Sequence, residues 1–336
     1  MSNILFVSPN PIWGGAATAN LSIAKMLQDN GHNVIFNDEY SETDEFNTVK
    51  IDHTPIHQKK FSDRKLLYKL VNENKVDYII WSPLVAIYFY KEITRLKKSG
   101  IHQLAIVHSL SLTKNFKGRL MDLLVSFTLA KMSTIIFVSE YTKNSWLKFT
   151  AVKKSKANKV VIHNLVDISA STHSLNKKPR IGFVGRLSEE KQPQLFCELS
   201  LITDFDFVVY GEGPLMSSLK PQFKSIEFKG QCSDSSKIYS NIDILIMTSK
   251  FENCPMVILE AQAFGLPCVA PNVGGLPELI DSGNNGILYD DYDPKTIITA
   301  INHIISNYSK FASKSLESSK NHTSSKTIKY WEEILK

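Results

Sequence analysis

The chain is poor in cysteine, and none of its four cysteines belongs to a closely spaced pair. All four lie in the second half, at Cys197, Cys232, Cys254 and Cys268, without a Cys-x-x-Cys motif. This pattern argues against a zinc knuckle and a disulfide framework, so we expect a reducing environment. Because no other cluster of metal-ligating residues stands out, we expect no cofactor and no essential divalent metal.

The chain also lacks a long apolar run, and its first residues do not show the pattern of a secretory leader. No stretch approaches the roughly 18 to 20 apolar residues that span a bilayer. The first residues, MSNILFVSPNP, contain neither a basic region nor a small-residue cleavage site. We therefore expect a protein that is neither transmembrane nor secreted. The expected location is the cytoplasm, and peripheral attachment to the inner face of the plasma membrane stays open.

What is present is an excess of positive charge in the first half. Residues 1–170 contain 22 Lys and Arg against 14 Asp and Glu, whereas residues 171–336 contain 17 against 19. Within residues 53–160 the numbers are 20 against 6. Such a field attracts a phosphate-rich or anionic-lipid surface, with a solvated basic face as the alternative. Nucleic acid is not expected as a partner, since no recognition-helix, zinc-finger or RNP-like pattern accompanies the charge.

Short apolar runs that end in Gly, Pro or Ser alternate with helical stretches along the whole chain, which is typical of a parallel sheet. The expected strands are 3–8, 32–37, 77–82, 103–108, 134–139 and 160–163 in the first half, and 180–185, 207–210, 226–228, 242–248, 268–271 and 286–289 in the second. The pattern predicts an α/β fold of two Rossmann-like domains whose parallel sheets face each other across a cleft.

The two halves define the expected domains. Residues 1–170 form the first and residues 180–320 the second, and the Ser-, Thr-, Asn- and Lys-rich segment 171–179 links them. Residues 309–326 are rich in Ser and Lys, so we expect them to be loosely structured. A helix within 321–336 closes the chain, and its packing back on the first domain stays open.

Two glycines, Gly14 and Gly15, stand where the first strand turns into a helix expected at 17–30. Glycine lets backbone N–H groups approach a ligand, and a helix amino terminus attracts phosphate. The alternative is a tight turn that merely needs a positive φ. A similar pair, Gly274 and Gly275, follows the strand 268–271 and offers a second cluster of amides.

Charged side chains follow two strands of the second half. Arg186 and Lys191 come after strand 180–185, where a planar guanidinium and a mobile ammonium suit a pyrophosphate, although a surface charge run is the alternative. Glu252 precedes a helix whose first residue we expect to be Pro255, and Glu260 lies within that helix. One carboxylate can bind sugar hydroxyls, and the other can bind a ribose diol.

Taken together, these motifs resemble the large retaining glycosyltransferase family 4. The resemblance rests on the spacing of Glu252 and Glu260, and on the runs EAQAFGLP (260–267), GGLPE (274–278) and FVGRLSEEK (183–191). Further matches in the same order are Gly14-Gly15, His108, SEYT (139–142), HNLVD (163–167) and YGEGP (210–214). The resemblance covers nearly the whole chain and is strongest between residues 180 and 288.

The resemblance implies a GT-B fold and a retaining hexosyltransferase that uses a nucleotide-sugar donor. It implies that Gly15, Arg186 and Lys191 bind the donor pyrophosphate, with Gly274 and Gly275 near the phosphate or sugar. It further implies that Glu260 binds the ribose, Glu252 the donor sugar, and that His108 sits beside the reacting carbon. The implied catalytic set is His108, Glu252, Arg186 and Lys191. The other implied donor-binding residues are Gly14, Tyr210, Gly211, Gly213, Asn253, Cys254, Pro255, Met256 and Val257.

Two sequences depart from the family pattern or imitate another one. Asn253-Cys254-Pro255 replaces a glycine-rich turn, and Pro255 has no N–H to offer a sugar hydroxyl, so the sugar stays open. Asp204-Phe205-Asp206 spells an Asp-x-Asp motif but precedes a strand, so we interpret it as a surface turn.

The acceptor is expected to be a saccharide, and a lipid-linked one is favoured in surface polysaccharide or glycoconjugate biosynthesis. Residues 114–132 read as an amphipathic helix with cationic ends, which suits an anionic membrane surface or a buried helix equally. A UDP-sugar is the favoured donor. A nucleotide-sugar epimerase and a non-catalytic nucleotide-sugar-binding subunit are the alternative functions.

Overall fold

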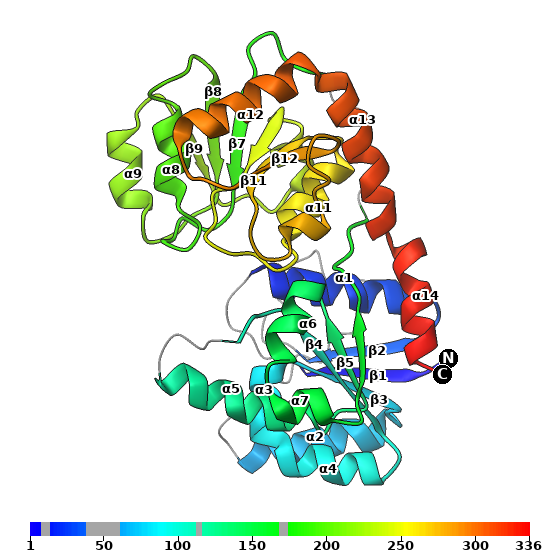
Figure 1. The fold of residues 1–336 in the computed structure, drawn as a ribbon. Helices are drawn as coiled ribbons and strands as arrows, with labels where there is room; N and C mark the ends of the chain where they lie inside the picture. The colour runs from blue at the N-terminus through cyan, green and yellow to red at the C-terminus, as the bar shows by residue number, and fades with distance from the viewer. Residues whose placement is uncertain (8–13, 38–60, 112–115, 168–173) are drawn as a thin grey trace. The chain divides into compact units, whose positions relative to one another are not determined.

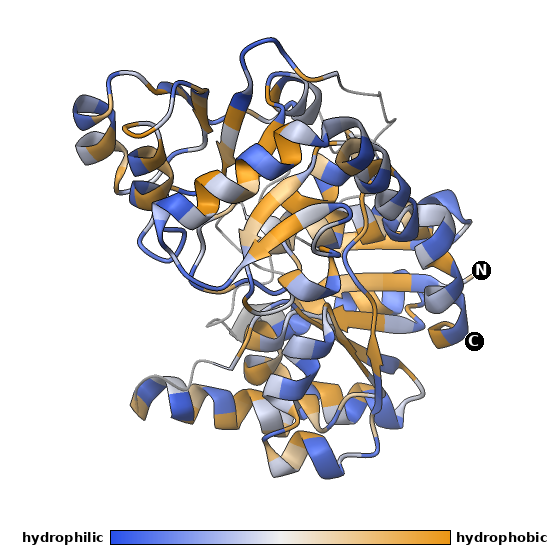
Figure 2. Cartoon of the chain, turned by 45° about the horizontal axis from the view of Figure 1, so that its top comes forward, coloured by the Kyte–Doolittle hydropathy of each residue, from blue (hydrophilic) through white to orange (hydrophobic). Residues whose placement is uncertain are grey.

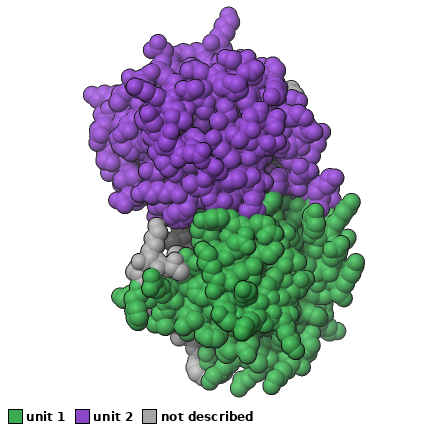
Figure 3. All heavy atoms as spheres, in the orientation of Figure 1, with its two compact units in different colours: residues 1–165, 327–336 green, residues 166–326 purple. Residues whose placement is uncertain are grey.

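The computed structural model describes residues 1–7, 14–37, 61–111, 116–167 and 174–336 (Figure 1). Within these residues the chain divides into two compact units (Figure 3). Unit 1 comprises Met1–Leu165 and Thr327–Lys336, and unit 2 comprises Val166–Lys326. The last ten residues therefore belong to the same unit as the first half of the chain. Residues 171–173 of the expected linker lie outside the described residues.

Unit 1 contains a six-stranded parallel sheet in the order β2-β1-β3-β4-β5-β6. Its strands are β1 (Asn3–Val7), β2 (Asn33–Asn37), β3 (Tyr78–Trp81), β4 (His102–Val107), β5 (Thr134–Phe137) and β6 (Asn158–Val161). The helices are α1 (Gly15–Asp29), α2 (Phe61–Glu73), α3 (Pro83–Ala86), η2 (Ile87–Phe89), α4 (Tyr90–Lys98), α5 (Phe116–Leu129), α6 (Glu140–Trp146) and α7 (Thr150–Lys154).

Two inner strands of unit 1, β3 and β5, are buried along their whole length because helices cover both faces of the sheet (Figure 1). Every residue of β3 and of β5 is buried. The core on one face includes Trp81, Phe89 and Phe137, and the Trp81 and Phe89 rings pack with centroids 5.4 Å apart. These strands consequently read as continuous apolar runs instead of alternating ones.

Unit 2 repeats this architecture with a second parallel sheet in the order β12-β11-β10-β7-β8-β9. Its strands are β7 (Arg180–Val184), β8 (Asp206–Tyr210), β9 (Glu227–Gly230), β10 (Ile244–Ile246), β11 (Cys268–Pro271) and β12 (Gly286–Tyr289). The helices are α8 (Pro193–Leu199), α9 (Met216–Gln222), α10 (Ser235–Tyr239), α11 (Met256–Ala263), η3 (Leu276–Glu278), α12 (Pro294–Ser306), α13 (Tyr308–Ser319) and η4 (Lys320–His322). Figure 2 shows the apolar strands of this sheet between more polar helix surfaces.

Helix α14 (Ser324–Ile334) closes the chain and spans the boundary between the units. Its residues Thr327, Ile328 and Trp331 are buried. The carboxylate of Glu332 acts electrostatically on His32, so this end of the helix lies near the start of β2 within unit 1.

The predicted α/β architecture of two Rossmann-like parallel sheets is confirmed, and the predicted ends of the twelve strands differ from the observed ones by at most two residues. Two local predictions are wrong. Residues 83–99 begin with Pro83 and precede Gly100, a pattern that predicts one helix. The structure divides them into α3, η2 and α4, because Phe89 leaves helical geometry (φ −110°, ψ 18°). The segment 309–326, expected to be loose, is mostly α13, η4 and the start of α14.

Packing explains the second error. Tyr308, Phe311, Ser315 and Ser319 form one buried face of α13, and this helix packs on α11. The Ser315 hydroxyl donates a hydrogen bond to the Leu266 carbonyl at 2.7 Å, and Tyr308 donates one to the Asp243 carbonyl at 3.0 Å. Tertiary contacts therefore override the weak helix propensity of serine.

Candidate functional site

The order of the strands places the candidate site of unit 2 before any side chain is considered. β7 lies between β8 and β10, so the chain reverses direction across the sheet between β7 and β10. In open parallel sheets, ligands bind beyond the carboxyl ends of the strands at such a switch point. The loops that follow β7 and β10 carry Lys191 and Glu252, respectively.

Lys191 and Glu252 form an ion pair that joins these two loops. The Lys191 Nζ atom lies 2.5 Å from the Glu252 Oε1 atom, and the Glu252 side chain is only 9% exposed. Two further hydrogen bonds join the loops. The Thr248 hydroxyl donates to the Lys191 carbonyl at 2.8 Å, and the Lys250 N–H donates to the Glu190 carbonyl at 2.8 Å. The geometry brings one cation and one carboxylate together at the switch point.

A second side chain fixes the Glu252 carboxylate. The Ser249 hydroxyl donates a hydrogen bond to Glu252 Oε1 at 2.6 Å, and Ser249 is 1% exposed. Because a buried carboxylate without partners is costly, the hydroxyl and the ammonium together offset the cost of burying the Glu252 side chain. Motif reasoning missed Ser249, because a serine in a loop carries no sequence signal of its own.

Gly274 brings a third loop, the one after β11, against Glu252. Its φ of +63° lies in the left-handed region, and a Cβ atom at this position would stand 1.9 Å from the Glu252 carbonyl oxygen. Only glycine permits that approach. The Gly275 N–H donates a hydrogen bond to the same carbonyl at 3.0 Å.

This contact shows what the Gly275 amide binds within the protein. The Gly275 amide was expected near a phosphate or sugar, but its hydrogen goes to the Glu252 carbonyl. The pair resembles Gly14-Gly15 in following a strand, but only the three-residue turn η3 comes after it. The glycine pair therefore holds Glu252 in place through the backbone.

The loop after β8 packs against the loop after β7 in a similar way. A Cβ atom on Gly211, whose φ is +127°, would lie 2.0 Å from the Gly185 carbonyl oxygen. A Cβ atom on Gly213 would lie 2.5 Å from the Leu187 carbonyl oxygen, and the Leu187 N–H donates to the Glu212 carbonyl at 2.9 Å. The backbone of 211–213 is thus part of the same set of strand-end loops.

Tyr210 itself is turned into the unit. Its side chain is buried, and its hydroxyl accepts a hydrogen bond from Asn241 Nδ2 at 2.6 Å. Asn241 also accepts a hydrogen bond from Arg180, at the opposite end of β7 from Arg186. Tyr210 therefore anchors the strand, and the backbone after it is what can face a ligand.

Arg186 and Glu190 complete the loop after β7. Arg186 is exposed. The Ser188 hydroxyl donates to Glu190 Oε1 at 2.6 Å, and this bond, helped by the charges of Lys191 and Arg186, lowers the pKa of the Glu190 carboxyl. The loop thus presents two cations beside Glu190, a carboxyl whose pKa is lowered.

Helix α11 begins at Met256, and Pro255 is its capping residue with φ −70°. The prediction that Pro255 is the first helical residue is wrong by one position, but Glu252 lies before the helix and Glu260 within it, as predicted. Cys254 and Met256 are buried, whereas Asn253 and Val257 are half-buried. The helix therefore orients the segment that follows Glu252.

Glu260 is paired with a tyrosine from the neighbouring helix. The Tyr239 hydroxyl, fully buried at the end of α10, donates a hydrogen bond to Glu260 Oε2 at 2.6 Å. Burial raises the pKa of Glu260, and the bond from Tyr239 partly opposes that rise. Burial and the charge of Glu260 raise the pKa of Tyr239. The sequence alone did not identify Tyr239 as a site residue, because it lies in no motif.

The candidate residues of unit 1 are arranged around α1 and β4. His108 directly follows β4, and its Nε2 atom lies 2.8 Å from the Asn20 Oδ1 atom on α1. Asn20 is 6% exposed, and burial lowers the pKa of His108 to about 4. His108 is therefore neutral near pH 7, and with Nε2 donating to Asn20 its Nδ1 atom is the acceptor.

Gly14 and Gly15 open helix α1. Gly14 is extended (φ −173°, ψ 170°), so a left-handed turn does not explain this glycine. No side chain caps the helix. The Gly14 carbonyl accepts from the Ala17 and Thr18 N–H groups at 2.9 and 3.2 Å, which leaves earlier amides outside the helical hydrogen bonds.

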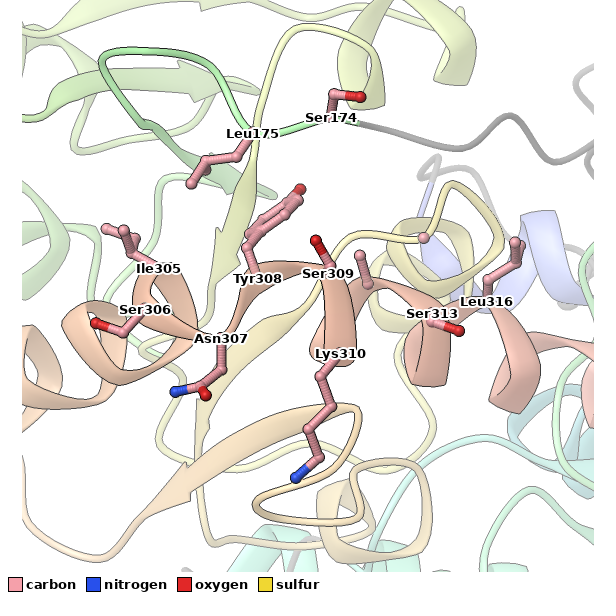
Figure 4. Close-up of a pocket in the computed structure, with 12 residues that line it drawn as sticks. Ser174, Leu175, Ile305, Ser306, Asn307, Tyr308, Ser309, Lys310, Ser313 and Leu316 are labelled. Carbon is pink, nitrogen blue, oxygen red and sulfur yellow. The ribbon is translucent and has the colours of Figure 1, made fainter.

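A separate pocket of unit 2 belongs to none of these groups. It has a volume of about 650 Å³ and lies along the junction of α12 and α13, lined in part by Ser174, Tyr308 and Lys310 (Figure 4). The Tyr308 hydroxyl is engaged with the Asp243 carbonyl, and the lining contains none of the predicted site residues. We therefore assign the site to the strand-end loops and not to this pocket.

Two further observations bear on ligands. In the part of the chain that the structure describes, no three His, Cys, Asp or Glu residues are placed to hold a metal ion. Asp206 of the Asp-x-Asp sequence begins β8 and pairs with Lys178 at 2.5 Å, on an exposed surface.

Among the described residues, none of the helices has the length and apolar character of a transmembrane span.

Known sequences resemble the chain over both units. The profile described as "Glycosyltransferase Family 4" matches residues 13–170, and the profile described as "Glycosyl transferases group 1" matches residues 178–307. A GDP-mannose-dependent alpha-mannosyltransferase of Corynebacterium glutamicum is 34% identical over 125 residues, which is 37% of this chain and 30% of the relative. A UDP-Gal:alpha-D-GlcNAc-diphosphoundecaprenol alpha-1,3-galactosyltransferase of Escherichia coli is 32% identical over 42% of this chain and 43% of its own length. The chain thus matches less than half the length of these two relatives.

Other similarities extend over the full length. An uncharacterized glycosyltransferase of Haemophilus influenzae is 26% identical over 96% of both chains. The crystal structure of HepE from Anabaena in complex with UDP-glucose superposes with a TM-score of 0.82, at 18% identity, over 100% of this chain and 99% of that one. This likeness identifies the fold as GT-B. From its motifs, its two profile matches and its fold, the chain belongs to the group 1 glycosyltransferases of family 4.

Proposed function

We propose that the chain transfers a hexose from a nucleotide-sugar to a saccharide acceptor with retention of anomeric configuration. The observation that carries the proposal is the Lys191–Glu252 pair at the switch point of unit 2, held by Ser249 and Gly274. A donor places a phosphate next to a sugar, so it needs a cation and a carboxylate side by side. The pair would open to let Lys191 contact the phosphate and Glu252 the sugar hydroxyls.

The chemistry requires no strong nucleophile from the protein. In a retaining transfer of this type, the bond between the sugar carbon and the phosphate oxygen breaks while the acceptor oxygen bonds to that carbon. The acceptor proton passes to the departing phosphate. Lys191 and the exposed Arg186 would stabilise the negative charge that develops there, which is commonly the largest single contribution to catalysis.

The remaining predicted residues have complementary roles in this proposal. Glu260, oriented by Tyr239, would accept hydrogen bonds from the ribose diol, and the backbone after Tyr210 would border the base. His108 would act beside the reacting carbon, where a neutral imidazole oriented by Asn20 accepts a hydrogen bond and adds no positive charge. The uncapped start of α1 at Gly14 and Gly15 would face a phosphate.

A UDP-sugar is the favoured donor and a lipid-linked saccharide the favoured acceptor, in surface polysaccharide or glycoconjugate biosynthesis. The HepE structure was solved with UDP-glucose, and the name of the E. coli relative specifies a UDP-sugar and a diphosphoundecaprenol acceptor. The C. glutamicum relative is named for GDP-mannose, so the base needs a direct test. The cationic segment 53–160 supports work at an anionic membrane surface on the cytoplasmic side.

A panel of UDP-, GDP- and ADP-sugars tests the proposal. Thermal-shift binding identifies the donor, and incubation with and without acceptor saccharides then separates the three candidate activities. Transfer to an acceptor supports the proposal. Conversion of the nucleotide-sugar without any acceptor identifies an epimerase, and binding without turnover identifies a non-catalytic subunit; either result would overturn the proposal.

A further inference from the structure

Helix α5 of unit 1 carries a stripe of large apolar side chains that the fold leaves exposed. Its residues are Phe116, Leu120, Leu123, Leu124 and Phe127, which are 82%, 51%, 44%, 43% and 51% exposed. Their spacing of four, three, one and three residues places them on one face of the helix. We call this face the α5 stripe. Isolated exposed apolar residues are ordinary on protein surfaces, whereas five large apolar residues on one helix face indicate a binding surface.

The α5 stripe is distinct from the face of α5 that packs in the core. Val125 and Leu129 on the other side of α5 are buried in the core of unit 1, together with Phe89 and Phe137. Asp122 and Ser126 are buried on that side as well. The helix is therefore already packed on the domain through one face, and its second apolar face is exposed among the described residues of unit 1. Figure 2 shows apolar residues along the length of α5.

Neighbouring elements extend the apolar surface. α3 and η2 pack against α5, and they contribute Leu84 and Tyr88, which are 49% and 40% exposed. Tyr90 at the start of α4 is also exposed, and the Lys131 ammonium lies over its ring at 5.6 Å. Aromatic side chains with a polar tip, such as these tyrosines, are favoured where water meets a lipid surface.

The charges around the α5 stripe have one sign. Lys117 and Lys131 are exposed at its two ends. Helix α4 reaches the end of α5 through Lys97, whose ammonium donates hydrogen bonds to the Lys131 and Met132 carbonyls at 2.9 and 3.0 Å. The exposed charges of α4 are Lys91, Arg95, Lys97 and Lys98. The acids of α4 and α5 are Glu92 and Asp122, and both are buried; Glu92 pairs with Arg64 at 3.3 Å. An apolar face with a cationic border matches a surface that is apolar within and anionic at its rim.

We propose that the α5 stripe inserts into the headgroup region of an anionic membrane and holds the protein there. The inference deepens the proposed function, since it rests on the membrane location proposed for the acceptor. It differs from attraction by charge alone, which salt screens within about 10 Å at 0.1 M and about 3 Å at 1 M. Inserted leucine and phenylalanine side chains add a contribution that salt does not screen.

A second copy of the chain is the competing occupant of this face. Two copies that met through the α5 stripe would bring their cationic borders together without an acid on either helix surface to oppose them. A bilayer of phosphatidylglycerol supplies that negative charge and the apolar interior at the same time. The charge pattern therefore favours lipid over self-association.

Vesicle co-sedimentation tests the proposal with the full-length protein. We expect binding to vesicles of phosphatidylcholine with phosphatidylglycerol that weakens but persists when salt is raised from 0.1 to 1 M. The triple variant Leu120→Gln, Leu124→Gln and Phe127→Gln should reduce partitioning at 1 M salt by about tenfold or more, from the apolar area withdrawn. The control Leu201→Gln with Ile202→Gln, two comparably exposed apolar residues of unit 2, should bind as the wild type does.

Depth of insertion is measured separately. A tryptophan placed by Phe127→Trp should be quenched by brominated lipids, whereas one placed by Leu201→Trp should not differ from a vesicle-free sample. Sedimentation of the triple variant equal to that of the wild type, or no quenching at position 127, would overturn the proposal. A wild-type dimer in light scattering that the triple variant converts to monomer would overturn it in favour of self-association.

These outcomes are separable from the proposed transferase activity. Donor affinity in the absence of vesicles should be the same for the wild type and the triple variant. If the wild type binds donor and transfers sugar but ignores vesicles, the inference about α5 fails while the proposed function stands. If the wild type inserts into vesicles through α5 but transfers no sugar from any donor, the proposed function fails while the inference about α5 stands.

Discussion

The carbonyl oxygen of Glu252 and the α-carbon of Gly274 are so close that no side chain fits between them: a Cβ atom on Gly274 would lie 1.9 Å from that oxygen. The same carbonyl accepts the Gly275 N–H at 3.0 Å. The loop after β11 therefore fixes the backbone of the loop after β10, and with it the carboxylate that faces Lys191.

Gly274→Ala is expected to disrupt this contact and to reduce both stability and donor affinity. A left-handed backbone costs a non-glycine residue about 1–2 kcal/mol, and the collision with the carbonyl adds to that cost. Gly283→Ala provides a matched control in the same unit, because Gly283 has φ +90° but nothing within 4 Å of its missing Cβ. Urea unfolding should show a loss for Gly274→Ala that exceeds the control by at least about 2 kcal/mol. Equal losses would show that the contact with Glu252 is unimportant.

Tyr239→Phe is expected to weaken donor binding through Glu260. Removal of the hydroxyl takes away the bond that opposes the burial-induced rise in the pKa of Glu260, so that pKa should rise further. Calorimetry should show that the variant binds donor about tenfold more weakly than the wild type. As the pH is lowered, the affinity of the variant should begin to fall at a higher pH than the affinity of the wild type. Tyr330→Phe, at an exposed tyrosine of α14, serves as the control. An unchanged pH profile for Tyr239→Phe would separate Tyr239 from the function of Glu260.

His108 is expected to make stability depend on pH in a defined direction. Its folded pKa of about 4 lies below the unfolded value of 6.5, so the unfolded chain binds more protons between these pH values. The stabilisation from neutral His108 is therefore complete above pH 6.5 and is lost as pH falls toward 4, by up to about 3 kcal/mol. Denaturant unfolding of wild type and His108→Gln should show a flatter pH dependence in the variant. Parallel curves of stability against pH for the two proteins would contradict the assignment of this pH dependence to His108.

Transfer is expected to proceed without a divalent metal and to retain the anomeric configuration of the donor. Lys191 and Arg186 already supply positive charge beside the proposed phosphate position. Activity should persist in EDTA, and NMR of the product should show the donor's anomeric configuration. A requirement for Mn²⁺ after EDTA treatment would exclude this mechanism, and so would an inverted linkage.

Residue patterns were sufficient to predict the sheets and the motif positions. Strand-to-helix turns are marked by Gly, Pro and charged residues, so Lys191, Glu252 and Gly274 could be placed at the ends of β7, β10 and β11 before their contacts were known. The apolar runs of the strands carry enough information because both faces of each sheet are covered.

What the sequence could not supply were partners from distant parts of the chain. Ser249, Tyr239 and Asn20 orient the predicted residues through contacts that only the folded chain brings together, and none has a distinctive spacing. Conversely, the serine-rich helix α13 was mistaken for a loop because its buried face depends on packing against α11. Of the helix expected over 114–132, Lys114 lies outside the described residues, and α5 turned out to have two apolar faces, of which only one is used in the core.

The most direct test compares donor affinity and turnover in variants of the two units. Lys191→Ala and Glu260→Ala should each weaken binding of the donor nucleotide-sugar by about tenfold or more, and Lys191→Ala should also slow turnover by about 10²- to 10³-fold. His108→Ala should leave donor affinity nearly unchanged and lower turnover alone. Calorimetry and initial-rate measurements on the same preparations give both quantities. Equal losses of donor affinity in all three variants, or full turnover in Lys191→Ala, would contradict the assignment of nucleotide binding to unit 2 and of the reaction centre to His108.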